Sequence, residues 1–288
     1  MASYQIFTDS ACDIAPETLK AWDVKYCSLS FLFDDSEKSY DNYEMPAKAF
    51  YEKIRQGHSA VTSSVNTEAF LDAFRETLEE GKDILYIGFS SGLSATYSCA
   101  CAAASELRDA FPSRRILTVD TLAASAGFGL ILYLTVQKRD AGATLEEAAA
   151  FAEAEKLHVC HWFTVDDLKA LLKGGRVKRA IGALGGALNL KPVLHMDNEG
   201  HLIPMSIARG RKGSLKAIVK KYGELALHPG RGPIFISHGD CLDDVKAIEA
   251  MLKSQYGPGL DLIADVGPVI GSHTGAGVLA LFFEGKER

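Results

Sequence analysis

The sequence predicts an α/β protein of two domains: an N-terminal three-layer α/β/α domain with a mostly parallel sheet, and a C-terminal α/β domain with a mixed or antiparallel sheet. Three observations predict this class. The 288 residues are many for one domain and ordinary for two. The first half alternates short apolar runs with helical patterns, as βαβ units do. In the second half, residues 197–200 form a polar turn between two apolar runs, which is typical of an antiparallel hairpin.

The strands of the first half are expected at short runs rich in β-branched and aromatic residues. These runs are residues 4–7, 26–33, 84–88 and 116–119. Helices are expected between them, where apolar residues recur every three or four positions. These helices are residues 45–56, 67–80 and 96–110. Parallel sheets bind ligands beyond the carboxyl ends of their strands, so the polar turns after these strands are candidate binding elements.

The domain boundary is expected near residue 156. Residues 122–136 are interpreted as a buried helix or, alternatively, a tunnel lining, because this apolar run is too short to cross a bilayer. The pattern breaks at residues 140–143, and Thr144 with Glu147 then predicts a capping box for one more helix. The expected domains are therefore residues 1–156 and residues 157–288.

The second half contains further apolar runs that predict strands, with two helical patterns between them. The expected strands are residues 159–165, 190–196, 202–205, 234–237, 260–266 and 278–283, and the expected helices are residues 215–227 and 242–255.

Composition excludes several classes of protein. The net charge of −6 gives no general attraction to nucleic acid, which is not expected as a partner. Six cysteines in a chain without a recognisable secretion signal are expected to be reduced and mostly buried, and the expected location is cytoplasmic. No metal site is expected at His158, Cys160 and His161, because along a strand His158 and Cys160 point to one face and His161 to the other.

The turn at residues 88–92 fits the pattern G-x-S-x-G and has three interpretations. In the first interpretation, Ser90 is the nucleophile of a serine esterase, and its partners are His273 and either Asp240 or Asp265. Alternatively, Ser94 only caps the helix that follows. In the third interpretation, the serine hydroxyls and the N-terminus of that helix bind an anion.

Several polar and glycine-rich segments occur in a fixed order along the chain. They are T-D-S-x-x-D-I from Thr8, a Thr62-Ser63 turn, S-S-G-L-S-x-T-Y from Ser90, D-T…S-x-G-x-G from Asp120, Lys173-Gly174-Gly175-Arg176, Ala208-Arg209, and G-x-H-T-G-x-G from Gly271. Together they resemble the DegV family of bacterial fatty acid-binding proteins, over nearly the whole chain.

The resemblance implies a fold of two domains with a long-chain fatty acid between them. Thr62, Ser94 and His273 match the residues that hold the fatty acid carboxylate, with Ser63 and Ser91 beside them in the same turns. Arg176 matches the supporting arginine, and Arg209 matches the arginine that faces a partner.

That partner is a fatty acid kinase, which forms an acyl phosphate for phospholipid metabolism. The resemblance therefore implies a carrier without turnover of its own and without a cofactor other than the bound lipid. Transient membrane contact is expected as well.

Two segments depart from the family pattern. Thr62 is followed by Ser63-Ser64-Val65 where the family has T-S-Q-P, and Ala276 replaces a typical proline. These departures concern acyl-length preference more than binding itself. A basic group around the glycine turn, made of Lys173, Arg176, Lys178, Arg179 and Lys191, is interpreted as a solvated loop or as a surface for the kinase or a lipid.

Overall fold

The computed structural model describes residues 4–166, 168–177, 189–257 and 259–288. Its first sheet has four parallel strands in the order β2-β1-β6-β7. The bounds are β1 (Tyr4–Asp9), β2 (Val24–Cys27), β6 (Asp83–Gly88) and β7 (Ile116–Asp120). Every residue of β1 and β6 is buried, as in central strands that are covered on both faces. The predicted parallel sheet is therefore confirmed.

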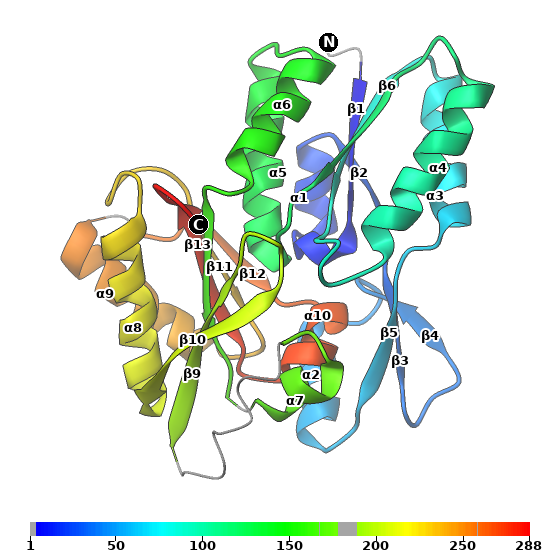
Figure 1. Ribbon diagram of the computed structural model, residues 1–288. Coiled ribbons are helices and arrows are strands. Elements are labelled where there is room, and N and C mark those ends of the chain that lie inside the picture. The colour runs from blue at the N-terminus through cyan, green and yellow to red at the C-terminus, as the bar shows by residue number, and fades with distance from the viewer. Residues whose placement is uncertain (1–3, 167, 178–188, 258) are drawn as a thin grey trace.

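Helices cover this sheet on both sides, which makes the predicted three layers (Figure 1). On one face lie α3 (Thr67–Glu79) and α4 (Thr96–Ala110), and on the other lie α5 (Ser125–Asp140) and α6 (Leu145–Glu155). The short elements η1 (Ser10–Cys12) and α1 (Pro16–Ala21) connect β1 to β2. The capping box at Thr144 and Glu147 is present as predicted.

The second sheet has six strands in the order β10-β9-β8-β13-β11-β12. Their bounds are β8 (Val159–Thr164), β9 (Leu190–Met196), β10 (Leu202–Arg209), β11 (Ile234–His238), β12 (Leu262–Asp265) and β13 (Leu279–Glu284). Only β11 and β12 pair in parallel within the described part of this sheet, so it is mixed, as predicted. The turn at residues 197–200 joins β9 and β10 as the predicted antiparallel hairpin.

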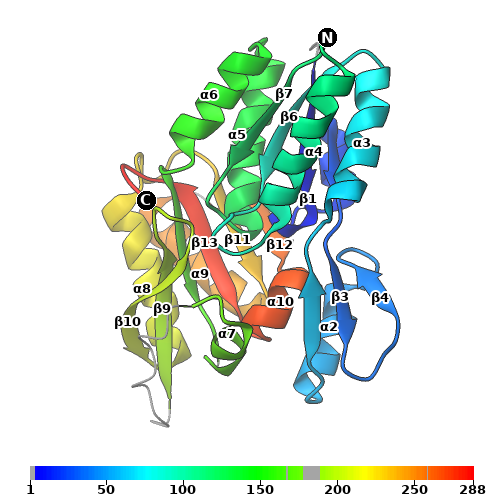
Figure 2. The same cartoon turned by 45° about the vertical axis from the view of Figure 1, so that its right-hand side comes forward.

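The second sheet is also covered on both faces. Helices α8 (Gly210–Leu225) and α9 (Leu242–Tyr256) pack on one face, and α5 packs against β8, β11 and β13 on the other (Figure 2). Helix α5 therefore lies between the two sheets. Most of its residues are buried, as predicted for residues 122–136. The division of the chain at residue 156 stays a prediction.

A third, antiparallel sheet was not predicted. It has the order β4-β3-β5, with β3 (Ser30–Phe33), β4 (Ser39–Asp41) and β5 (Ala60–Ser63). Two predictions were wrong here. Residues 26–33 are not one strand, because the chain leaves the first sheet after Cys27 and enters this small sheet at Ser30. Residues 61–63 are not a turn, because they pair with β3.

Three short helices gather beside the small sheet: α2 (Ala47–Arg55), α7 (Lys169–Gly174) and α10 (Pro268–Thr274). Helix α10 lies within the glycine-rich segment and contacts α2, α7, β3 and β5 (Figures 1 and 2). Residues far apart in the sequence hold its N-terminal end in place. Asn42 accepts the Val269 N–H at 2.9 Å, and the Tyr51 hydroxyl donates to the Val266 carbonyl at 2.8 Å.

Candidate functional site

The candidate site is a cavity of about 400 Å³ between the first and second sheets, bordered by α10 and the small sheet. Most of its lining is apolar, including Phe89, Leu93, Phe163, Met196, Val269, Ile270 and Phe282. Polar lining residues gather where β5, α10 and the turn before α4 meet: Thr62, Ser63, Ser64, Ser94, Arg176 and His273. This part of the wall is called the polar end below. The cavity therefore has the amphipathic lining that an amphiphilic ligand requires.

Thr62 and His273 form the central pair of the polar end. Their side chains come from β5 and α10, and Thr62 Oγ1 lies 2.8 Å from His273 Nε2. Burial, together with the smaller effect of the nearby positive charge of Arg176, lowers the pKa of His273 to about 4. The imidazole is therefore neutral at pH 7 before a ligand arrives. A bound anion would raise this pKa, because an opposite charge favours the imidazolium.

Gly174 allows the approach of α7 to His273. A Cβ at this position would lie 2.6 Å from His273 Nδ1, which is closer than side chains pack. Helix α7 then ends at Gly175, whose φ of 67° is the left-handed conformation that glycine adopts without strain. The glycines of the Lys173–Arg176 motif thus close a helix and bring Arg176 to the cavity.

Arg176 stands at the rim of the polar end. Its Nη1 donates to the Gly174 carbonyl at 2.7 Å, and its Nε donates to the Leu93 carbonyl at 3.4 Å. The residue is exposed, and its hydrogen-bond partners among the described residues are carbonyl oxygens. Its charge is therefore available to a ligand anion.

Ser94 has two roles in the structure. Its Oγ accepts the Thr96 N–H at 3.2 Å and lies 2.9 Å from Thr96 Oγ1, so it supports the start of α4. The same residue lines the cavity, together with Ser63 from β5. The prediction that Ser94 caps α4 was wrong, because the N-cap residue is Ala95 and makes no side-chain cap hydrogen bond. Anion binding by Ser94 stays a prediction, and its place in the cavity lining is compatible with it.

Ser91 and Arg209 lie away from the cavity. Ser91 is exposed, its N–H donates to Asp120 Oδ1 at 3.3 Å, and it is absent from the described lining. Its role as a carboxylate ligand therefore stays a prediction. Arg209 ends β10 on the surface, which leaves its partner-binding role a prediction.

Ser90 is fully buried and holds the β9–β10 hairpin. Its Oγ donates to the Gly200 carbonyl at 2.9 Å and accepts the Gly92 N–H at 3.2 Å. His273 pairs with Thr62 instead, so the serine and the imidazole of the esterase interpretation do not meet. Neither acid candidate completes the triad, because Asp240 pairs with Arg55 and Asp265 lies 3.6 Å from His238.

The inner wall of the cavity carries a polar cluster that was not predicted as part of the site. Ser125 Oγ donates to Asp13 and lies 2.9 Å from Ser237 Oγ, while Asp13 Oδ1 accepts the Gly267 N–H at 3.0 Å. Burial raises the pKa of Asp13 to about 7. The motifs around Asp13 and Ser125 were noted in the sequence. Only the fold shows that they meet.

The other basic and metal-like groups have simple structural explanations. Cys160 donates to the Glu287 carbonyl, and His161 Nδ1 lies 2.9 Å from the Val159 carbonyl on the opposite face of β8. Lys191 pairs with Asp166. Lys178 and Arg179 lie outside the described residues. Two surface groups, Asp34-Asp35-His58 and Asp197-Glu199-His201, have metal-like spacing, but such exposed acidic groups are common without a metal.

Among the described residues, no helix has both the length and the apolar character needed to cross a membrane.

The fold and the cavity define a class of α/β proteins whose two main sheets enclose an apolar space with one polar end. The model of the family described as "Uncharacterised protein, DegV family" matches residues 3–286. A DegV domain-containing protein of Clostridium perfringens is 40% identical over 291 residues, covering 100% of this chain and 99% of the relative. The chain belongs to the DegV family.

Solved structures of similar proteins have the same fold. A DegV family protein from Thermus thermophilus, described by its fatty acid binding, is 30% identical with a TM-score of 0.88, over 98% of this chain and 99% of that one. A stearic acid-binding protein from Eubacterium ventriosum is 25% identical with a TM-score of 0.88, over 98% of each chain. The predicted family and fold class are thereby confirmed.

Proposed function

We propose that the protein binds one long-chain fatty acid in the cavity, with the carboxylate at the polar end. The observation that carries the proposal is the lining: an apolar space of about 400 Å³ that ends at the Thr62–His273 pair, Ser94 and Arg176. Relatives of the same fold are described as binding fatty acids, stearic acid among them.

The energetics favour a long chain. Hydrogen bonds to a charged group contribute roughly 1.5–3 kcal/mol each, so three of them about offset the cost of removing a carboxylate from water. Each buried methylene contributes about 0.8 kcal/mol, and about 15 of them supply on the order of 12 kcal/mol before ordering costs. Burial of the tail thus sets affinity, and the polar end sets the orientation.

Extraction under denaturing conditions, followed by mass spectrometry, tests the proposal. We expect about one fatty acid per chain. The variants Ser94→Ala and His273→Ala should retain less lipid, while Ser98→Ala, an exposed serine in the first turn of α4, should behave as wild type. Empty protein that also takes up no added palmitate would contradict the proposal.

The proposal extends to a partner: the bound carboxylate is presented to a separate fatty acid kinase for acyl-phosphate formation. Ser63, Ser64 and Arg176 are exposed, so the polar end faces the outside of the molecule and a partner's active site can approach it. In a reconstituted assay with kinase and ATP, Arg209→Ala should reduce acyl-phosphate formation without changing lipid retention. Equal turnover by the variant and by wild type would show that Arg209 is not part of the interface with the kinase.

The esterase alternative makes a contrary prediction. A fluorophosphonate probe would label a nucleophilic Ser90. We expect no labelling, because the hydroxyl is buried and donates to the Gly200 carbonyl.

A further inference from the structure

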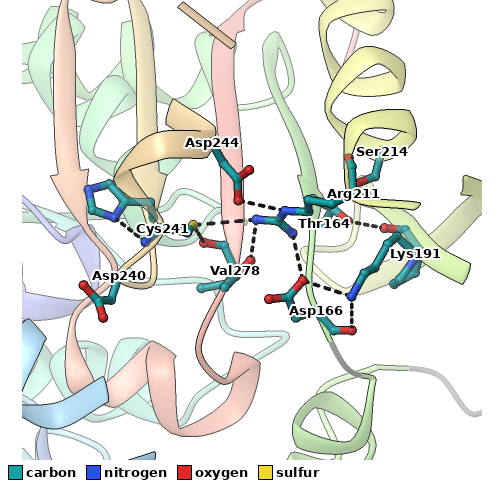
Figure 3. Close-up of polar contacts among 12 residues, drawn as sticks. Thr164, Asp166, Lys191, Arg211, Ser214, Asp240, Cys241, Asp244 and Val278 are labelled. Atoms are coloured by element: carbon teal, nitrogen blue, oxygen red, sulfur yellow. Dashed lines mark hydrogen bonds and ion pairs between the residues drawn. The ribbon is translucent and has the colours of Figure 1, made fainter. Parts of the chain in front are cut away.

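The segments that carry His273 and Arg176 both contact one further arginine, Arg211. Arg211 lies at the start of α8 and does not line the cavity. Figure 3 shows its guanidinium directed between the loop after β8, the loop before β13 and the start of α9. A cation in the first turn of a helix is unfavourable for the helix dipole, so its neighbours must stabilise it there.

The contacts of Arg211 join three parts of the chain. Its Nε donates to Asp244 Oδ2 at 2.9 Å, and its Nη2 donates to the Gly277 carbonyl at 2.7 Å (Figure 3). Its Nη1 lies 3.7 Å from Asp166 Oδ1. Lys191 holds the same aspartate from the other side, with Nζ 2.9 Å from the Asp166 carbonyl and 3.0 Å from Oδ1.

Two of the contacted residues, Asp166 and Gly277, belong to the segments that carry the polar end. Asp166 precedes α7, which ends beside Arg176, and Gly277 follows α10, which carries His273. The two segments also contact each other directly at two points. A Cβ at Gly277 would lie 2.2 Å from Asp166 Oδ2, and one at Gly174 would lie 2.6 Å from His273 Nδ1.

We propose that Arg211 is a positioning residue for the polar end, holding α7 and α10 at the separation where Arg176 and His273 face one carboxylate. The guanidinium suits this task because it is planar and donates in several fixed directions at once, which an ammonium group does not. This inference rests on the proposed function. It adds that recognition of the carboxylate, rather than of the tail, depends on Arg211.

Comparing an acid with the matching alcohol tests the inference. After delipidation, the binding of palmitic acid and of 1-hexadecanol is measured for wild type, Arg211→Met and Lys191→Met. Lys216→Met, an exposed charge on the same helix, is the matched control. We expect Arg211→Met to bind palmitic acid about tenfold more weakly, the size of one lost bond to a charged group, with hexadecanol binding nearly unchanged. Lys191→Met should lower the affinity for palmitic acid relative to that for hexadecanol as well, but by a smaller factor.

The outcomes separate the two proposals. A wild type that binds neither compound contradicts the proposed fatty acid site. A wild type that prefers the acid, with the same preference in Arg211→Met, contradicts the positioning role alone. Equal weakening of both compounds would also contradict it, since that indicates a general loss of structure. If Arg211→Met does not fold, Lys191→Met decides the question through its effect on the acid-to-alcohol ratio.

Discussion

We expect His273 to couple carboxylate binding to proton uptake. In the empty site its pKa is about 4, lowered by burial and then by Arg176. A bound carboxylate raises the pKa of this imidazole, so the complex binds more protons than the empty protein between the two pKa values. Affinity for the carboxylate should therefore increase as pH falls from the bound pKa towards 4.

Titration calorimetry near pH 6, in buffers of different ionisation enthalpy, measures this uptake. We expect a fraction of a proton taken up with palmitate by wild type and none by His273→Gln. Identical buffer dependence in the two proteins would show that another group takes up the proton.

Asp13 predicts a second pH effect, on folding, which also favours lower pH. Burial raises its pKa to about 7, against about 3.9 in an unfolded chain. The folded state therefore binds more protons than the unfolded state between these values, and this carboxyl's contribution to stability is lost as pH rises from about 4 to about 7. Asn at this position can still accept the Gly267 N–H and can donate to Ser125.

Asp13→Asn should therefore gain stability relative to wild type as pH rises from 5 to 8. Urea unfolding at the two pH values measures the difference. A constant difference would show that Asp13 is ionised throughout this range.

At the scale of elements, α5 depends on a glycine for its close contact with β8 and β13. A Cβ at Gly127 would lie 2.4 Å from His161 Nε2 and 2.5 Å from Phe282. Gly127→Ala should therefore lower the free energy of unfolding by roughly 1–3 kcal/mol, as overpacking does.

The matched control for this substitution is Gly213→Ala in α8. There the nearest contact of a new Cβ is an ordinary 3.6 Å, and helix propensity favours alanine by about 0.5–1 kcal/mol. Denaturant unfolding should move in opposite directions for the two variants. A neutral Gly127→Ala would mean that α5 can shift away from the sheet at little cost.

The elements that could be predicted from the sequence are those with a strong local signal. The buried runs of β1 and β6, the periodic α3 and the capping box of α6 each depend on residues close together in the chain. The small sheet gives no such signal. Residues 60–63 of β5 are half-buried or exposed and rich in hydroxyls, which is equally typical of a turn.

The residues of the candidate site also differ in whether they could be predicted from the sequence. Resemblance supplied Thr62, Ser94, Arg176 and His273, and the cavity brings all four together. It also supplied Ser91, which is not among the described residues that line the cavity. The Asp13–Ser125–Ser237 cluster could not be predicted, because its members come from the residue after η1, from α5 and from β11, and meet only in the tertiary structure.

At the scale of the whole molecule, Arg288 joins segments from both main sheets. Its guanidinium is largely buried and donates to the carbonyls of Thr121 and Leu122, which lie between β7 and α5. It also donates to the carbonyl of Asp197 in the β9–β10 hairpin, at 3.4 Å. Further donations reach Lys156 and Val159, at the start of the second sheet.

The hairpin lies directly against the first half of the chain. The Ser90 hydroxyl donates to Gly200, and a Cβ at Gly92 would lie 2.9 Å from the carbonyls of Glu199 and Gly200. Met196 and Leu202, at the ends of the two strands that the hairpin joins, line the cavity. Loosening the hairpin would therefore open one wall of the ligand space.

Arg288→Met should have two effects, because it keeps most of the apolar stem and removes every hydrogen bond of the guanidinium. The loss of these hydrogen bonds should lower the free energy of unfolding by roughly 1–3 kcal/mol. Fatty acid should also dissociate faster, measured by transfer of a fluorescent fatty acid to vesicles. Lys286→Met, a nearby exposed charge, is the control and should change neither quantity. Reduced stability with an unchanged dissociation rate would contradict this prediction. It would show that the ligand leaves by a route that does not involve the hairpin or the wall formed by Met196 and Leu202.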